Sequence, residues 1–222
     1  MNKSAQNDHL NVLQYAHENG CPWNKWTCKV AAGEGNLNIL QYAHENGCPW
    51  NKQTCAAAAN AGHLNTLQYA CENGCPWDES ILCTVAAEMG HLDILQYARE
   101  KGCPWDEKTS TVAASKGHVK LLQYAHEKDC PWDEETCVKA AQNGQLITLK
   151  YAHENGCPWG ESTCASAAEY GYLHILKYAR ENGCPWDTQT CSCAAIKGNL
   201  KDRKSTRLNS SHSIASRMPS SA

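Results

Sequence analysis

A four-residue motif, Gly-Cys-Pro-Trp, recurs along this chain at nearly constant spacing. Its tryptophans are 27, 27, 28, 27, 27 and 27 residues apart, and they are Trp23, Trp50, Trp77, Trp105, Trp132, Trp159 and Trp186. One copy is altered, with Asp129 in place of the glycine. Self-similarity at a fixed period of about 20–50 residues is typical of stacked repeat proteins. The period therefore predicts a linear array of similar units.

Each unit contains the signals of two helices. An Asn or Asp follows most of the tryptophans and is suited to accept a hydrogen bond from the first turn of a helix as an N-cap; these residues are Asn24, Asn51, Asp78, Asp106, Asp133 and Asp187. The first helix then presents Cys28, Ala31 and Ala32 on one face of small residues. A second helix follows, which Gly47 ends in a left-handed conformation before Pro49. We expect an all-α solenoid of antiparallel helix pairs, each contacting its sequence neighbours.

The run AAGEGNLNILQYAHENGCPWN, from Ala31 to Asn51, is similar to the ankyrin run A-A-x-x-G-H-L-x-x-[VL]-x-x-L-L-x-x-G-A-D-V-N. His63, His91 and His118 fall at the position of the ankyrin histidine between the two helices. An ankyrin unit has about 33 residues, so the units here are about 6 residues shorter, and the missing residues belong to its β-turn finger. The resemblance implies a solenoid with shortened or absent fingers that serves as a protein–protein interaction scaffold.

The array is expected to span residues 1–201, as six full helix pairs with half a repeat at each end. Neither end shows the polar outer face that caps a solenoid, so we expect a fragment of a larger adaptor, such as a ubiquitin-ligase substrate receptor. Residues 202–222 resemble the translation of a sequencing adaptor, and we expect a disordered, non-native tail. The alternative is a natural basic tail that binds acidic partners. The extra residue of the 28-residue unit, near Ile81 and Leu82, is expected in a connection between helices.

The fifteen cysteines raise the question of a metal, haem or redox site. No C-x-x-C motif occurs, so the spacing does not support a redox pair. Within a unit His17, Cys21 and Cys28 are candidate ligands, but Arg99 and Arg180 take the place of the histidine in other units, whereas zinc needs about four ligands. The Cys-Pro dipeptide also resembles that of haem-responsive proteins. We expect no cofactor and no metal, with a Cys-rich metal- or haem-binding repeat protein as the alternative.

Positions that are the same in nearly every unit are expected to build the framework. They include Cys21, Pro22, Trp23, Cys48, Trp50, Trp77, Trp105, Trp132, Trp159 and Trp186. The cysteines are expected to be small buried hydrophobes. The tryptophans are expected to brace adjacent units, with an exposed aromatic binding edge as the alternative.

Positions that change between units are expected to contact a partner, and they cluster on the first helix and its entry. The proposed partner-binding residues are Trp26, Lys29, Met89, Lys116 and Tyr170. Large apolar and charged groups of this kind often dominate protein interfaces. The alternative is that these positions vary because they only face solvent.

Charge and composition narrow the function further. Residues 1–201 carry 16 Lys and Arg against 22 Asp and Glu, a net charge of −6, which argues against binding to nucleic acid. No apolar run approaches the roughly 18 residues of a membrane span, and no signal peptide is evident. No phosphate-binding loop or nucleophile motif indicates an enzyme. We expect a cytoplasmic, monomeric, non-enzymatic protein with reduced thiols, and a non-functional fragment of an expanded repeat family remains a third hypothesis.

Overall fold

The computed structural model describes residues 3–24 and 26–196, which form fourteen helices and no strand. The helices are α1 (Lys3–Glu18), α2 (Thr27–Gly33), α3 (Leu37–Glu45), α4 (Lys52–Ala61), α5 (Leu64–Glu72), α6 (Glu79–Met89), α7 (Leu92–Glu100), α8 (Glu107–Lys116), α9 (Val119–Glu127), α10 (Glu134–Gln142), α11 (Leu146–Glu154), α12 (Glu161–Glu169), α13 (Leu173–Glu181) and α14 (Thr188–Ile196). The all-α prediction is confirmed. The tail predicted at residues 202–222 lies outside the described residues. No helix in the described part of the chain is long and apolar enough to cross a bilayer.

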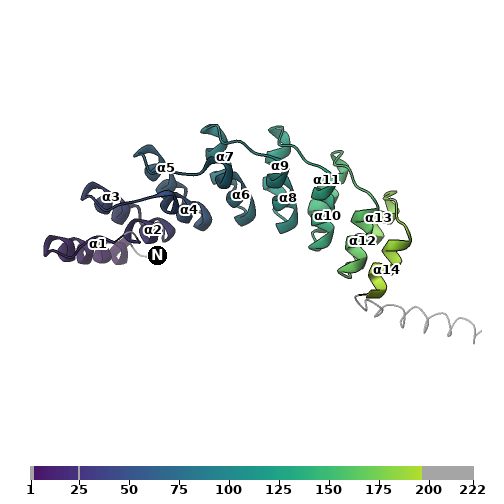
Figure 1. Ribbon diagram of the computed structural model, residues 1–222, viewed down its shortest axis with the longest axis horizontal. Coiled ribbons are helices and arrows are strands. Elements are labelled where there is room, and N and C mark those ends of the chain that lie inside the picture. The colour runs from purple at the N-terminus through teal and green to yellow at the C-terminus, as the bar shows by residue number, and fades with distance from the viewer. Residues whose placement is uncertain (1–2, 25, 197–222) are drawn as a thin grey trace, which may run out of the picture. The chain divides into compact units, whose positions relative to one another are not determined.

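The chain divides into two compact units, Met1–Thr109 with Glu127–Cys130, and Ser110–His126 with Pro131–Ala222. In the first unit α2 packs against α3 and α4, α4 against α5 and α6, and α6 against α7. In the second unit α10 packs against α11 and α12, and α12 against α13 and α14. Within each unit, first helices lie beside first helices and second helices beside second helices (Figure 1). The predicted stacking of helix pairs is therefore present in both units.

Small residues make this stacking possible. On α2 the buried side chains are Cys28, Ala31 and Ala32, and α3 contributes Leu40 and Ala43. Because the first helix carries only short side chains on its buried face, the next first helix can approach it closely and leave few voids.

The second helix ends as predicted. Gly47 has a φ of +79°, and the N–H of Cys48 donates to the carbonyl oxygen of Ala43 at 2.9 Å. This 6→1 hydrogen bond with a left-handed residue is the Schellman motif. Asp129 adopts the same conformation, with a φ of 60°, although its Cβ makes this region unfavourable.

The predicted N-caps are present in several units. The side-chain oxygen of Asn51 accepts a hydrogen bond from the N–H of Gln53 at 2.9 Å, and that of Asp106 accepts one from Lys108 at 3.0 Å. The prediction is wrong for Asp133, whose side chain makes no capping hydrogen bond. Its φ of −140° is close to the −152° of Asn51, so the difference lies in the side chain.

The extra residue of the 28-residue unit lengthens a helix, so its prediction in a connection is wrong. Ile81 and Leu82 lie inside α6, which has 11 residues, whereas α4 has 10. Their N–H groups both donate to the carbonyl oxygen of Asp78, at 3.3 and 3.1 Å. The insertion therefore enlarges the first turn of α6, where its backbone groups find helical partners. Leu82 is 4% exposed and takes the place of a threonine that is buried in other units, such as Thr54.

Candidate protein-binding surface

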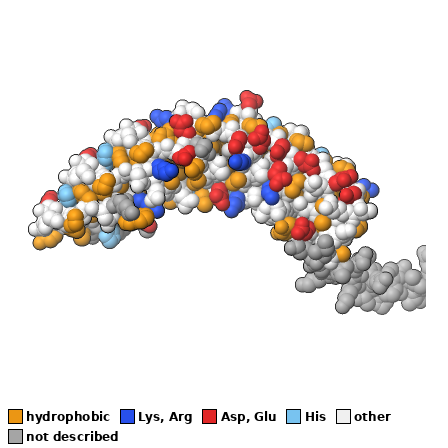
Figure 2. Space-filling model, in the orientation of Figure 1, with side chains coloured by type: hydrophobic (Ala, Val, Ile, Leu, Met, Phe, Trp, Pro, Cys, Tyr) orange, Lys and Arg blue, Asp and Glu red, His pale blue; other side chains and the backbone are white. Residues whose placement is uncertain are grey.

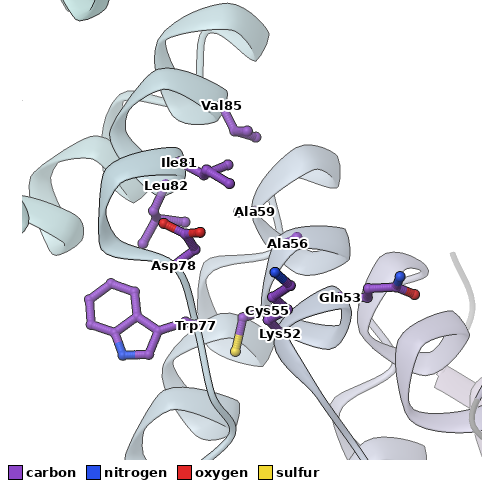
Figure 3. Close-up of a pocket in the computed structure, with 10 residues that line it drawn as sticks. All are labelled: Lys52, Gln53, Cys55, Ala56, Ala59, Trp77, Asp78, Ile81, Leu82 and Val85. Atoms are coloured by element: carbon purple, nitrogen blue, oxygen red, sulfur yellow. The ribbon is translucent and has the colours of Figure 1, made fainter.

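A pocket of about 140 Å³ lies between α4 and α6 of the first unit. The residues that line it are Lys52, Gln53, Cys55, Ala56, Ala59, Trp77, Asp78, Ile81, Leu82 and Val85. Figure 3 shows Ile81 and Val85 extending from α6 toward α4, where Ala56 offers only a methyl group. The wall is mainly apolar, with a few polar groups at its edge. Such a concave surface suits a single apolar side chain of a partner.

The extra residue of α6 accounts for this pocket. Ile81 is 48% exposed and has no counterpart in the 27-residue units, which reach the helix cysteine one residue sooner after Trp. Leu82 fills the buried threonine position, so Ile81 is left on the outside of the turn. A branched aliphatic side chain exposed beside a pocket has an unfavourable contact with water that a partner can remove.

A second, open depression of about 600 Å³ continues this surface across α2 and α4. It shares Gln53, Ala56 and Val85 with the pocket, and Val30 of α2, which is 57% exposed, also lines it. Apolar side chains are thus accessible across the first helices α2, α4 and α6. We call this the α2–α4–α6 surface. Val30, Ile81 and Val85 were not among the partner-binding residues predicted from the sequence, although the single 28-residue spacing was a signal for Ile81.

The predicted partner-binding residues of the first unit lie at the two ends of its first helices. The Nζ of Lys29 is 4.7 Å from the centre of the Trp26 ring, a cation–π contact, and Trp26 is 47% exposed. Lys29 also lines the open depression. Met89 ends α6 and is 41% exposed, and it does not line the pocket or the depression. The structure therefore brings Trp26 and Lys29 together and places Met89 elsewhere.

The remaining two predicted residues belong to the second unit. Lys116 ends α8 and is exposed. Tyr170 is 44% exposed, and its hydroxyl oxygen accepts a hydrogen bond from Nε2 of Gln142 on the preceding first helix, at 2.9 Å. This unit presents acidic helix starts, at Glu134 and Glu161, and Figure 2 shows Asp and Glu side chains gathered over its helices.

The repeated tryptophans stack on a planar group from the preceding helix. The ring of Trp50 lies 3.5 Å from that of His44, and Tyr69 of the next second helix approaches its edge at 6.2 Å. The same arrangement occurs at Trp23 with His17 (4.3 Å), Trp132 with His126 (3.9 Å) and Trp159 with His153 (3.6 Å), and guanidinium groups replace the imidazole at Trp105 with Arg99 (4.0 Å) and Trp186 with Arg180 (4.7 Å). Because an imidazole and a guanidinium group are both flat and can stack on an indole, either His or Arg can occupy this position. The substitution of Trp50 described below tests the predicted brace.

Trp77 differs from the other tryptophans. Cys71 occupies the position that carries His or Arg in the other units, so no planar side chain from that position can stack on Trp77. Trp77 is also one of the residues that line the apolar pocket between α4 and α6. The unit with the insertion is therefore also the unit with the altered stack.

Most cysteines are buried. They are Cys28, Cys48, Cys55, Cys75, Cys83, Cys103, Cys130, Cys137, Cys157, Cys164 and Cys184. The thiol of Cys75 donates to the carbonyl oxygen of Asn51 at 3.3 Å, and that of Cys157 donates to the carbonyl oxygen of Asp133 at 3.2 Å, in each case to the loop 24 residues earlier. The prediction that Cys21 is buried is wrong, because this residue is exposed and its thiol is directed to the carbonyl oxygen of the adjacent Pro22, at 4.0 Å.

The buried thiols Cys83 and Cys103 do not favour the metal-binding alternative. Burial raises the pKa of the Cys83 thiol, and burial also raises the pKa of Cys103 to about 12. Metal ligation requires the thiolate form, which such a shift disfavours. Among the residues that the structure describes, no group of three or more His, Cys, Asp or Glu side chains is arranged to hold a metal ion.

Comparison with solved structures places this geometry among known folds. The human ASB11 ankyrin repeat domain superimposes with a TM-score of 0.62 and 14% sequence identity, covering 71% of this chain and 84% of that domain. The chain has the ankyrin-repeat fold. No protein-family model and no curated protein matches the sequence. The resemblance seen in the sequence is thereby confirmed for the fold, in which successive helix pairs recur at the 27- or 28-residue spacing of the tryptophans.

Proposed function

We propose that the chain is a non-enzymatic ankyrin-repeat scaffold that binds another protein through its first helices. The observation that carries the proposal is the α2–α4–α6 surface, where Val30 and Ile81 are 57% and 48% exposed beside a pocket of about 140 Å³. Apolar side chains gathered in this way on the surface of a soluble domain often mark a site of interaction. In the other units the first helices repeat small residues on their buried face, and this face packs against the neighbouring helices.

The residues of the proposed interface have different roles. Ile81 and Val85 would contact an apolar side chain that enters the pocket, and Lys29 with Trp26 would form a mixed cationic and aromatic edge. We also keep the prediction of a partner contact for three residues at the ends of their first helices, Met89, Lys116 and Tyr170. An anchor in a pocket surrounded by a polar rim is the usual arrangement at the energetic centre of an interface.

A matched pair of substitutions tests the proposal. Ile81→Ser removes the aliphatic group at the pocket, and Ile147→Ser makes the same chemical change at an exposed position of the second helix α11, where Ile147 is 72% exposed. Residues 1–201, without the tail, serve as bait for affinity capture from cell extract with quantitative mass spectrometry. We expect at least one protein to be retained by the parent and by Ile147→Ser and to fall at least tenfold with Ile81→Ser, which is about 1.4 kcal/mol of binding free energy. If all captured proteins respond equally to both variants, the proposed surface is wrong.

Other parts of the functional hypothesis have their own tests. The larger adaptor predicted from the sequence is tested by reading the genomic frame on both sides of this sequence. The monomeric state is tested by light scattering of residues 1–201, and the cytoplasmic location by imaging of a tagged chain.

A further inference from the structure

Two thiols face each other inside the helix pair α4–α5. The Sγ atoms of Cys55 and Cys71 are 3.9 Å apart, although the residues are 16 positions apart in the sequence. Cys55 is 1% exposed, whereas Cys71 is partly exposed at the end of α5 and can be reached by a small molecule. In the equivalent helix pair α2–α3, His44 occupies the position of Cys71, and Cys28 occupies the position of Cys55. The thiol pair is therefore a feature of this one unit.

We infer that Cys55 and Cys71 form a peroxide-sensitive thiol pair that closes into a reversible disulfide. The thiolate of Cys71 attacks one oxygen of hydrogen peroxide, so an S–O bond forms, the O–O bond breaks, and the departing hydroxide takes up the thiol proton as water. The sulfur of Cys55 then attacks the resulting sulfenic acid. The S–S bond forms, the S–O bond breaks, and the second hydroxide leaves with the proton of Cys55 as water. Two thiols are oxidised, and one peroxide is reduced to two waters.

The surroundings favour Cys71 as the attacking sulfur. The hydrogen bond from Cys55 lowers the pKa of the Cys71 thiol, and the nearby Tyr97 hydroxyl and Lys101 ammonium act in the same direction, while burial and Glu72 act against them. The same hydrogen bond raises the pKa of Cys55. The partly exposed Cys71 thus has the larger thiolate fraction, and the buried Cys55 is suited to resolve the sulfenic acid.

Disulfide closure requires a modest movement. The present separation of 3.9 Å must fall to about 2.05 Å, which rotation of the two side chains and a shift of the last turn of α5 can supply. Cys75 is less suited as a partner, because it is buried and its thiol is engaged with the carbonyl oxygen of Asn51. Cys55 also lines the pocket of the α2–α4–α6 surface, so closure would alter that wall. The thiol pair does not depend on whether the pocket binds a protein.

The test uses the full chain with Cys21→Ser, Cys191→Ser and Cys193→Ser, which remove the two exposed thiols and one partly exposed thiol. The protein is treated with hydrogen peroxide, the remaining thiols are alkylated, and the chain is digested with chymotrypsin and a glutamate-specific protease. Cleavage after Trp50, Tyr69, Glu72 and Trp77 places Cys55, Cys71 and Cys75 on three different peptides. We expect the peptide of Cys55 to be linked to that of Cys71 and to be released by dithiothreitol.

Three variants decide between the thiols. Cys71→His introduces the residue that the preceding unit carries at this position, His44. Cys71→His and Cys55→Ala, each as a single substitution, should abolish the linked peptide, whereas the control Cys75→Ala should retain it. Cys55→Ala should also leave a sulfenic acid on Cys71 that dimedone labels. A disulfide of Cys75 with either thiol, or no linked peptide in a chain whose circular dichroism shows it to be folded, would overturn the inference. None of these readouts requires a binding partner, so they fail or succeed separately from the proposed function.

Discussion

Substitution by alanine should lower the free energy of unfolding by very different amounts at two glycines of the same helix pair. Gly35 and Gly47 both have left-handed backbone, with φ of +69° and +79°. A Cβ added at Gly47 meets no atom within 4 Å, whereas one added at Gly35 would lie 2.6 Å from Nδ1, 2.7 Å from Cε1 and 2.8 Å from Cγ of His63. Alanine in left-handed backbone is unfavourable at both positions, whereas a clash of the added Cβ with the His63 ring occurs only at Gly35.

The expected magnitudes follow from these two terms. The left-handed conformation of a residue with a Cβ costs about 1–2 kcal/mol, so Gly47→Ala should lower the free energy of unfolding by about 1 kcal/mol. Displacement of the His63 ring adds a cost of the order of overpacking, about 1–3 kcal/mol, so Gly35→Ala should cost about 2–4 kcal/mol in total. Urea unfolding followed by far-ultraviolet circular dichroism measures both values.

A double-mutant cycle separates the steric cost from the backbone cost. In the background of His63→Ala the ring is absent, so Gly35→Ala should cost about as much as Gly47→Ala, which corresponds to a coupling of about 1–3 kcal/mol. Equal losses for the two glycines in the parent chain, or no coupling between Gly35 and His63, would refute the reasoning. Either outcome would mean that His63 does not pack over the end of the preceding first helix as the structure indicates.

Three further predictions concern other features of the array. Asp129→Gly removes a non-glycine residue at a φ of 60° and should raise the free energy of unfolding by about 0.5–1 kcal/mol, as measured by urea unfolding, while Lys128→Gly should not. Trp50→Ala removes a ring stacked 3.5 Å from His44 and should cost about 3 kcal/mol, whereas Trp186→Ala, at a ring that is 45% exposed, should cost about 1 kcal/mol; equal costs would contradict the predicted brace. Because burial raises the pKa of Cys103 from 9.0 to about 12, the unfolded chain loses this proton first as the pH rises, so its contribution to stability should be complete below pH 9 and fall between pH 9 and about 12. Over this pH range the free energy of unfolding should fall less steeply with pH in Cys103→Ala than in the parent chain. Identical slopes in the two proteins would contradict the raised pKa of Cys103.

The fold was readable from the sequence because it is local and repeated. The spacing of Trp23, Trp50 and their equivalents defines the unit, and a glycine near most helix ends defines where the chain turns, as the φ of +79° at Gly47 confirms. Small residues at Cys28, Ala31 and Ala32 indicated which face is buried. Each of these signals acts within one unit or between neighbours, so repetition let one unit check another.

The candidate site was less predictable. Trp26 and Lys29 were selected because they vary between units, and they do contact each other, but the same criterion did not select Val30 or Ile81. Variation in sequence shows where a side chain is free to change, and it does not show whether several such side chains share one depression. That depends on how α2, α4 and α6 pack.

The sequence alone determined that this chain is a stack of short ankyrin-like helix pairs, because period, capping and helix-ending signals act over a few residues. The tertiary structure decided the rest. Only packing could place the extra residue inside α6, open a pocket beside Ile81, and bring the sulfur atoms of Cys55 and Cys71 to 3.9 Å across two helices. Those features arise from distances between elements, which no spacing along the chain specifies.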